Sequence, residues 1–339
     1  MRERRGDIEA ARGLAIVLVV FGHIVARQDP AGVEWYEPLR RAVYAFHMPL
    51  FLYLSGLVAV YSGFLRQKRV KFWALAGRRA KRLLVPFFGL GLLIVLGKCA
   101  ARGLVHVDNA PSGLGSGVLA LVWDTGHSPA ISIWYLFVLF VVSLGAILVL
   151  DGRPARLPFL LAGALAVFWV PLPAYLYLDR IGMFAPFFLL GAAAGFAGAR
   201  WDGFMDRFWP WAMAVFGVAL VAVAMLPACS EWEQKAILLA VGGISLPSIH
   251  GFLRCSRLFW LQQAISRPFL LLGRYSFMIY LFNTLCIGLA KGVMLLFWSW
   301  DGAHFYLFAP ALMCAGLAGP MGLKRYAFRR VRVLDRLTD

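Results

Sequence analysis

The chain has 339 residues, of which 61% are apolar and only 15% are charged, and its net charge is +17. This composition excludes a soluble globular protein, because the apolar stretches are about twenty residues long and apolar on all sides, as helices that face lipid are. The positive charge does not indicate nucleic-acid binding, since most of the 34 lysines and arginines fall at ends and loops expected in the cytoplasm.

The apolar stretches predict an all-α integral membrane protein, a single bundle of about ten transmembrane helices with both termini in the cytoplasm. The expected spans are residues 9–27, 43–63, 83–101, 131–150, 157–175, 181–199, 208–227, 235–252, 269–290 and 303–322. We expect one polytopic membrane domain over residues 1–326 and a basic cytoplasmic tail over 327–339. The first span is expected to stay as a signal anchor, and the composition favours a bacterial inner-membrane protein.

The first span, RGLAIVLVVFGH, carries two ionisable residues, Arg12 and His23. Their spacing places both on one stripe of a helix, about 16 Å apart along its axis. Ionisable groups inside a membrane helix are functional candidates, because the bilayer core solvates charge poorly. Arg12 is suited to an anionic group, and a neutral His23 is suited to act as a general base.

Each of these two residues also has a structural interpretation. A buried histidine can serve only to bond a neighbouring helix. An arginine at a helix end can serve topology, and Glu9 lies three residues earlier, within reach of Arg12 for a surface ion pair. The residues alone leave both interpretations open.

The second span opens with FHMPLFLYLSG, which contains His47. Since the first helix is expected to run outward and the second inward, His23 and His47 both fall in the outer half of the membrane. The two histidines can then face one cavity, or His47 can simply mark the helix start at the interface.

The most basic loop, residues 66–82, contains Arg79 and Arg82 on one expected helix face. Two guanidinium groups on one face can hold a pyrophosphate through bidentate contacts. A basic loop that only anchors the topology is the other interpretation.

The longest external segment, about residues 102–130, is rich in Gly, Pro and Ser, and we expect it to form a cap or an acceptor-binding loop. Trp134 and Tyr135 follow it at the start of the fourth span. Such aromatic side chains can stack on a sugar ring or belong to the aromatic belt of the membrane interface.

The ninth span places Ser276, Tyr280 and Asn283 on one polar stripe of an apolar helix. A stripe of this kind either lines a cavity or bonds another helix. The five cysteines are scattered and lack metal-ligand spacing, so neither a disulfide nor a metal site is expected.

Taken in order, these segments resemble the acyltransferase-3 family of integral membrane acyltransferases, which includes bacterial O-acetylases of surface polysaccharides. Arg12 and His23 match the family's R-x10-H motif, and FHMPLFLYLSG is similar to its second-helix signature. Arg79-x-x-Arg82 followed by LLVP matches its R-x-x-R element. The segments WYL at 134–136, FAPFFLLGAAAG and LLGRYSFMIYLFN resemble later helices, so that the resemblance spans roughly residues 7–290.

The resemblance implies an acyl-CoA donor, usually acetyl-CoA, as a co-substrate with no permanently bound cofactor, and a sugar or glycan hydroxyl as the acceptor. It implies that His23 is the catalytic base and that Arg12, Arg79 and Arg82 bind the donor. The candidates for lining the site or binding the acceptor are His47, Trp134, Tyr135, Ser276, Tyr280 and Asn283. Two positions depart from the family pattern: Asn283 stands where a histidine is frequent, and Glu9 stands where an aspartate is frequent.

Two other classes of function fit the same composition. A transporter or flippase for a glycan or a lipid-linked substrate would also have buried polar groups, but we find no repeat and no paired broken helices. A non-catalytic subunit of a polysaccharide assembly system would bind CoA without turnover. The oligomeric state is not indicated by the sequence.

Overall fold

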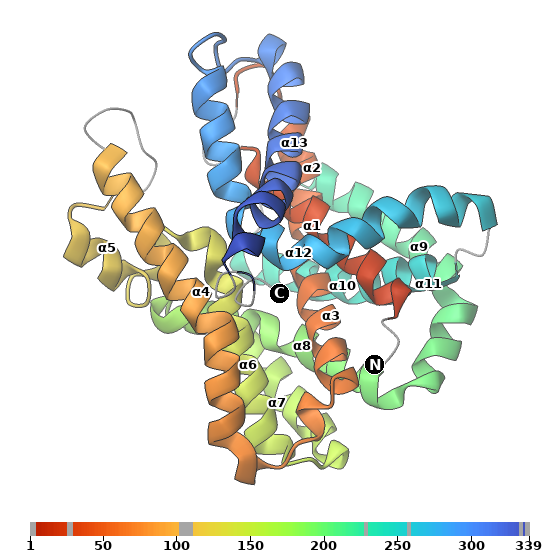
Figure 1. Ribbon diagram of the computed structural model, residues 1–339. Coiled ribbons are helices and arrows are strands. Elements are labelled where there is room, and N and C mark those ends of the chain that lie inside the picture. The colour runs from red at the N-terminus through yellow and green to blue at the C-terminus, as the bar shows by residue number, and fades with distance from the viewer. Residues whose placement is uncertain are drawn as a thin grey trace. The chain divides into compact units, whose positions relative to one another are not determined.

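The computed structural model describes residues 5–25, 30–101, 111–226, 230–255, 259–331 and 335. All regular elements in these ranges are helices, as Figure 1 shows. Helices are the expected solution in a bilayer, because each backbone N–H and C=O must find its partner within the segment itself. The all-α membrane class predicted from composition is therefore confirmed.

The chain divides into two compact units, and the chain passes between them at Leu54–Ser55 and again at Phe196–Ala197. Unit 1 consists of Met1–Leu54 and Ala197–Asp339, and unit 2 consists of Ser55–Phe196. The first of these boundaries lies within the helix α3, His47–Tyr61.

Unit 1 is built around the pairing of its first helix with a long helix near the C-terminus. Its elements are α1 (Gly6–His23), α2 (Tyr36–Tyr44), the start of α3, α9 (Ala199–Met225), α10 (Glu231–Ser245), the π-helical turn η7 (Leu246–His250), α11 (Gly251–Cys255), α12 (Phe259–Met294), α13 (Gly302–Tyr326) and η8 (Phe328–Arg330). α1 packs mainly against α12, which also packs against α13. The start of α10 carries a capping box, in which Ser230 and Glu233 bond each other's backbone N–H groups.

Unit 2 packs its long helix α4 against α6. Its elements are the rest of α3, η1 (Phe64–Arg66), η2 (Arg69–Lys71), α4 (Phe72–Ala101), α5 (Leu114–Ala120), η3 (Thr125–His127), η4 (Ile131–Ile133), α6 (Trp134–Leu150), η5 (Pro154–Arg156), α7 (Leu157–Trp169), η6 (Tyr175–Tyr177) and α8 (Leu178–Ala197). The segment expected to be external is described over residues 111–130, where it forms α5 and η3. Residues 102–110 lie outside the described ranges.

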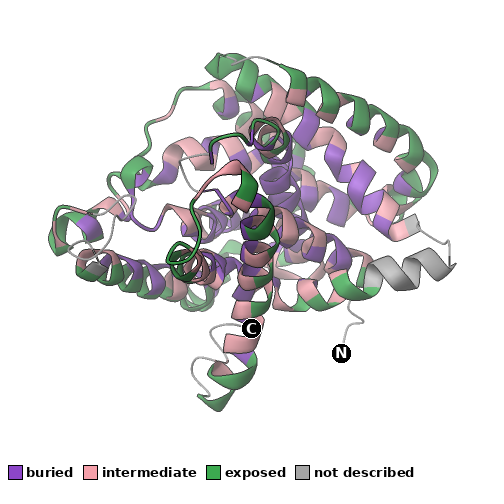
Figure 2. Ribbon diagram, turned by 90° about the horizontal axis from the view of Figure 1, so that it is seen from above, coloured by how far each residue is buried: buried purple, intermediate pink, exposed green. Residues whose placement is uncertain are grey.

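Eight of the described helices are long and apolar enough to cross a membrane. They coincide with eight of the ten expected spans, and the other two expected spans fall on α1, which carries Asp7, Glu9 and Arg12, and on the shorter apolar helix 154–169. Several helices expose large apolar side chains, among them Leu93, Val218 and Leu289. Figure 2 shows buried and exposed residues on different sides of many of these helices, as expected where one side faces lipid.

Three sequence predictions stay predictions: the count of ten spans, the cytoplasmic termini, and the division into a domain 1–326 and a tail 327–339. Most of that tail, residues 332–334 and 336–339, lies outside the described ranges, as does Cys229. Among the described residues, no group of three or more His, Cys, Asp or Glu side chains is placed to hold a metal ion.

Candidate functional site

His23 ends α1 and lies against Asn283 in the middle of α12. The His23 Nδ1 and the Asn283 Oδ1 are 2.7 Å apart, which is a short hydrogen bond. Asn283 is fully buried, whereas His23 keeps part of its surface exposed. The polar stripe of the ninth span therefore bonds another helix at Asn283.

The hydrogen bonds of Asn283 determine which nitrogen of His23 carries the proton. The Asn283 Nδ2 donates to the backbone carbonyls of Ile279 and Tyr280, both at 2.8 Å. The Asn283 Oδ1 therefore faces His23. Because an amide oxygen can only accept, the His23 Nδ1–H must be the donor. In the neutral imidazole, Nε2 then holds a free lone pair, and no described residue is hydrogen-bonded to it. An unprotonated Nε2 on a partly exposed ring is the arrangement that a general base requires.

Two glycines fix the register that brings His23 to Asn283. A Cβ on Gly13 would lie 1.9 Å from the Phe269 carbonyl oxygen, and one on Gly273 would lie 2.0 Å from that of Glu9. Because each Cβ points toward the N-terminus of its helix, this reciprocal contact places Gly13 and Gly273 at one level of two parallel helices. His23 follows Gly13, and Asn283 follows Gly273, by the same number of residues. The close glycine contact thus aligns the two polar side chains.

Tyr44 lies between α1 and α3 and contacts residues next to or at the two predicted histidines. Its hydroxyl donates to the Gly22 carbonyl at 2.8 Å, next to His23, and its ring lies 4.9 Å from the ring of His47. The His47 Nδ1–H donates to the Val43 carbonyl at 2.9 Å, so that the Nε2 of a neutral His47 is also an acceptor. Tyr44 therefore contacts both His47 and the residue that precedes His23, and a common cavity for the two histidines stays a prediction.

The remaining candidates of unit 1 lie on α1 and α12. Ser276 and Tyr280 are buried, and the Tyr280 ring lies 6.5 Å from that of Phe51 on α3. Arg12 is partly buried on α1. Glu9, considered from the sequence as a partner for Arg12, lies 3.7 Å from the Arg274 guanidinium of α12.

Arg79 and Arg82 lie on α4 in unit 2 but have different surroundings. The Arg79 Nε donates to the Ser143 Oγ of α6 at 3.0 Å, and its guanidinium carbon lies 4.4 Å from the centre of the Phe64 ring. These contacts orient Arg79 through a neutral hydroxyl and a ring, and no described residue is bonded to its two terminal nitrogens. Arg82 is exposed and acts electrostatically on Arg79.

Trp134 and Tyr135, at the start of α6, also have protein partners. The Tyr135 hydroxyl lies 2.5 Å from the Ser55 Oγ. The Arg180 guanidinium lies over the Trp134 ring, 4.8 Å from the ring centre. The centre of the Phe184 ring is 4.9 Å from the centre of the Trp134 ring. Stacking of a sugar on Trp134 would therefore have to share the ring with Arg180.

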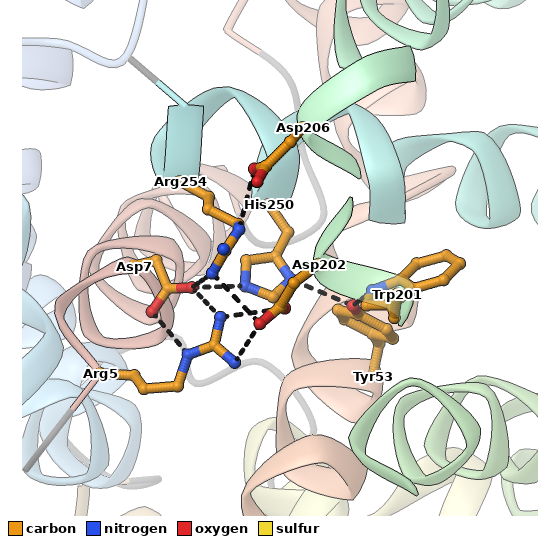
Figure 3. A network of polar contacts seen from close by, with 8 residues as sticks. All are labelled: Arg5, Asp7, Tyr53, Trp201, Asp202, Asp206, His250 and Arg254. Atoms are coloured by element: carbon orange, nitrogen blue, oxygen red, sulfur yellow. Dashed lines mark hydrogen bonds and ion pairs between the residues drawn. The ribbon is translucent and has the colours of Figure 1, made fainter. Parts of the chain in front are cut away.

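Unit 1 contains a second polar cluster, shown in Figure 3, that the sequence motifs do not predict. It joins the start of α1 to α3, α9, η7 and α11, and its members are Arg5, Asp7, Tyr53, Trp201, Asp202, Asp206, His250 and Arg254. Arg5 bonds the carboxylates of both Asp7, at 2.7 Å, and Asp202, at 3.1 Å. Arg254 contacts Asp202 at 3.3 Å and Asp206 at 2.9 Å.

His250 lies fully buried at the centre of this cluster. Its Nδ1 is 3.0 Å from the Tyr53 hydroxyl, and its Nε2 is 3.4 Å from the Asp7 Oδ2. The Trp201 Nε1–H donates to the same Tyr53 oxygen at 2.8 Å. Burial opposes ionisation of Asp7, but the hydrogen bonds from His250 and Arg5 outweigh it and hold the pKa of Asp7 well below its ordinary value.

Spacing in the sequence carries a partial signal for this cluster. Asp202 and Asp206 stand four residues apart on one helix, and His250 and Arg254 stand four residues apart on another. The first pair therefore places two acidic side chains on one helix face, and the second pair places two basic side chains on one face. Which helices meet is not encoded in that spacing, since Asp7 and His250 are separated by most of the chain.

Comparison with known proteins finds similarity along nearly the whole chain. Residues 5–325 match the acyltransferase-3 family model, which describes an acyltransferase domain, and this confirms the resemblance inferred from the motifs. Nodulation protein NolL of Sinorhizobium fredii (strain NBRC 101917 / NGR234) is 36% identical over 105 residues, which cover 30% of this chain and 27% of that protein. Nodulation protein NolL of Mesorhizobium japonicum (strain LMG 29417 / CECT 9101 / MAFF 303099) is 28% identical over 139 residues, 40% of this chain and 34% of that protein.

These alignments span 27% and 34% of the length of the two curated relatives. No solved structure matches the chain.

Proposed function

Since the chain belongs to the acyltransferase-3 family, we propose that it moves an acyl group, acetyl in our proposal, from cytoplasmic acyl-CoA to a hydroxyl of a sugar in a surface or exported glycan. The family and the apolar helices make it a multi-pass membrane acyltransferase. We place it in the cytoplasmic membrane of a bacterium, and both NolL relatives are bacterial proteins. The observation that carries the proposal is the hydrogen bond from His23 to Asn283.

In the proposed reaction, the Nε2 of His23 takes the proton of the acceptor hydroxyl as its oxygen attacks the thioester carbonyl carbon. The C–S bond of the resulting tetrahedral intermediate then breaks, and the same proton passes from His23 to the departing sulfur. The products are the sugar ester and free CoA, so that atoms and charges balance without a covalent enzyme intermediate. General-base help of this kind contributes about 10²–10⁴ in rate.

Asn283 acts in this scheme as a positioning residue. Its Oδ1 accepts a hydrogen bond from the His23 Nδ1–H, which keeps the proton on Nδ1. The lone pair needed for catalysis therefore stays on Nε2. The amide is itself locked, because both of its N–H groups are bonded to the backbone of α12. His47 lies on α3, and Ser276 and Tyr280 lie on α12 together with Asn283; we assign all three to the lining of the acceptor and oxyanion positions.

We assign Arg79, Arg82 and Arg12 to the CoA donor. Arg79 supports this assignment, because its contacts with Ser143 and Phe64 orient a guanidinium without neutralising its charge. A guanidinium held in this way can give its terminal N–H groups to phosphate oxygens. The exposed Arg82 adds a second positive charge one helical turn further on.

The direct experiment supplies acetyl-CoA labelled in its acetyl group to proteoliposomes of the full chain, with an extract of bacterial membrane glycans inside. The proposal predicts label in ester linkage to glycan, released by mild base, together with an equal amount of free CoA. Donor hydrolysis without any labelled glycan would refute the sugar acceptor. Absence of both CoA binding and CoA release would refute the donor.

A further inference from the structure

The aromatic ring of Tyr44 is an exposed surface in unit 1 that the scheme above does not use. Tyr44 ends α2, which packs against α1. Tyr44 is 41% exposed, whereas Tyr36 on the same helix is fully buried. Because the Tyr44 hydroxyl is already bonded to the Gly22 carbonyl at 2.8 Å, the exposed area belongs mainly to the ring.

Gly22 allows this ring to lie close to His23. A Cβ on Gly22 would be 3.1 Å from the Tyr44 Cε1 and 3.1 Å from its hydroxyl oxygen, which is closer than ordinary van der Waals contact. Glycine at this position therefore lets the ring lie against the backbone of α1, one residue before His23. The ring of His47 on α3 lies 4.9 Å from the Tyr44 ring, centre to centre. The Tyr44 ring is thus held by two helices of one unit, next to the residue assigned as the base.

The face of α2 that carries Tyr44 is polar. Glu37, Arg40 and Tyr44 follow one another at intervals of three and four residues, which places them on one helix face. The Arg40 Nε donates to the Glu37 Oε2 at 2.7 Å, and both charged groups act electrostatically on the Tyr44 hydroxyl. An ion pair whose Glu37 side chain is 40% exposed is costly to place against hydrocarbon. This face is therefore suited to water or to a polar ligand, and the exposed Tyr44 ring lies at its end.

The chemistry of this face defines the ligand that it fits. Since the Tyr44 hydroxyl is tethered, its ring offers an apolar surface, while the neighbouring carboxylate and guanidinium offer hydrogen bonds. A sugar ring matches both, because it has C–H faces that pack on an aromatic ring and hydroxyls that bond charged groups. We propose that the acceptor sugar packs on the exposed ring of Tyr44, which makes Tyr44 an acceptor-binding residue beside His23. This inference rests on the proposed function, because it assigns a binding surface to the acceptor of that reaction.

Sugar binding without any acyl donor tests this assignment. The full chain in lipid nanodiscs is titrated with maltotetraose, chitotetraose and mannotetraose by saturation-transfer NMR. Tyr44→Leu removes the ring and Tyr44→Phe keeps it, and both variants lose the hydrogen bond to Gly22. For at least one sugar we expect binding to weaken by about tenfold in Tyr44→Leu and by less than about twofold in Tyr44→Phe. The control is Tyr306→Leu, which removes another exposed aromatic ring of unit 1 and should bind the sugar as the wild type does.

The pair of Tyr44 variants separates sugar packing from a structural role. Both lose the tether between α2 and α1, so equal losses of sugar binding in the two variants would overturn the proposal. Unchanged binding in Tyr44→Leu would also overturn it and would assign the ring to the lipid interface. Failure of the wild type to bind any of the three sugars would overturn it as well.

Transfer in proteoliposomes distinguishes a failure of this site from a failure of the proposed reaction. Tyr44→Leu should raise the acceptor KM and leave the donor KM unchanged. Transfer with the wild-type acceptor KM in Tyr44→Leu would refute the site and leave the acyl-transfer function standing. Ring-dependent sugar binding by a protein that transfers no acyl group would uphold the site and refute only the acyl-transfer function.

Discussion

His23 on α1 and Asn283 on α12 form a 2.7 Å hydrogen bond because the two helices run parallel in a register set by Gly13 and Gly273. The bond has a chemical consequence, since it keeps the proton of a neutral His23 on Nδ1. The close packing of α1 against α12 at Gly13 thus determines the protonation pattern of His23, ten residues further along α1.

The first prediction concerns the hydrogen-bond acceptor of His23. Asn283→Leu keeps the volume of the side chain but removes the Oδ1, so the turnover number should fall by at least about tenfold while the donor KM stays the same. Asn283→Asp keeps an acceptor and should retain more activity than the leucine variant. The measurement is CoA release in proteoliposomes, and equal activities of wild type and Asn283→Leu would contradict the positioning role.

The second prediction concerns the helix register. Gly13→Ala or Gly273→Ala puts a methyl group within 2.0 Å of a backbone carbonyl oxygen, so the helices must separate. Each variant should lose about 1–3 kcal/mol of stability and most of its activity. Gly288→Ala is the control on α12, because a Cβ there meets no atom within 4 Å. Thermal unfolding in detergent, together with the turnover number, checks the prediction, and a fully active Gly13→Ala protein would refute the proposed register.

The third prediction concerns the stability of the Asp7 cluster as a function of pH. Asp7 precedes the expected first span, and its folded-state pKa lies below the ordinary value of 3.8. A lowered pKa means that ionised Asp7 stabilises the fold above that ordinary value, and that this stabilisation is lost as the pH falls further. The unfolding midpoint of the wild type should therefore drop between about pH 5 and pH 3.

Asp7→Asn provides the comparison, because it keeps the shape of the side chain and removes its titration. The variant should be less stable near neutral pH by about 1–3 kcal/mol, since Arg5 and His250 lose a charged partner. The difference in the free energy of unfolding between the wild type and Asp7→Asn should become smaller as the pH falls. A constant difference over the whole range would show that the charge of Asp7 contributes nothing.

The fourth prediction concerns the donor. Arg79→Ala should raise the CoA dissociation constant by about tenfold or more, and Ser143→Ala should raise it less, because it removes only the bond that orients the guanidinium. Arg78→Ala is the matched control, since Arg78 is exposed on the same helix and carries the same charge for membrane topology. Equal affinities in the Arg79 and Arg78 variants would assign Arg79 to topology alone.

The sequence could predict whatever depends on local pattern. Long apolar stretches were sufficient for the all-α membrane class, and helical spacing was sufficient to place Asn283 on a polar stripe. Spacing could not show that this stripe meets His23, because that contact depends on two glycines whose role appears only when α1 and α12 are packed together. The Asp7 cluster was missed for the same reason, since its carboxylates and guanidiniums come from segments far apart in the chain.

Aromatic and basic residues were the hardest to interpret from sequence. The sequence predicts that Trp134 can stack on a sugar, but Arg180, which lies over its ring, comes from a helix more than forty residues later. Arg79 and Arg82 looked equivalent on one helix face. Only packing against Ser143 and Phe64 separates the held arginine from the exposed one.

The most direct test of the account is single-turnover acyl transfer by His23→Ala beside the wild type, in proteoliposomes saturated with acetyl-CoA and glycan extract, with CoA binding measured on the same preparations. The account predicts that the variant binds CoA as tightly as the wild type and transfers acetyl groups slower by about 10²–10⁴-fold. Transfer at the wild-type rate by His23→Ala would contradict it.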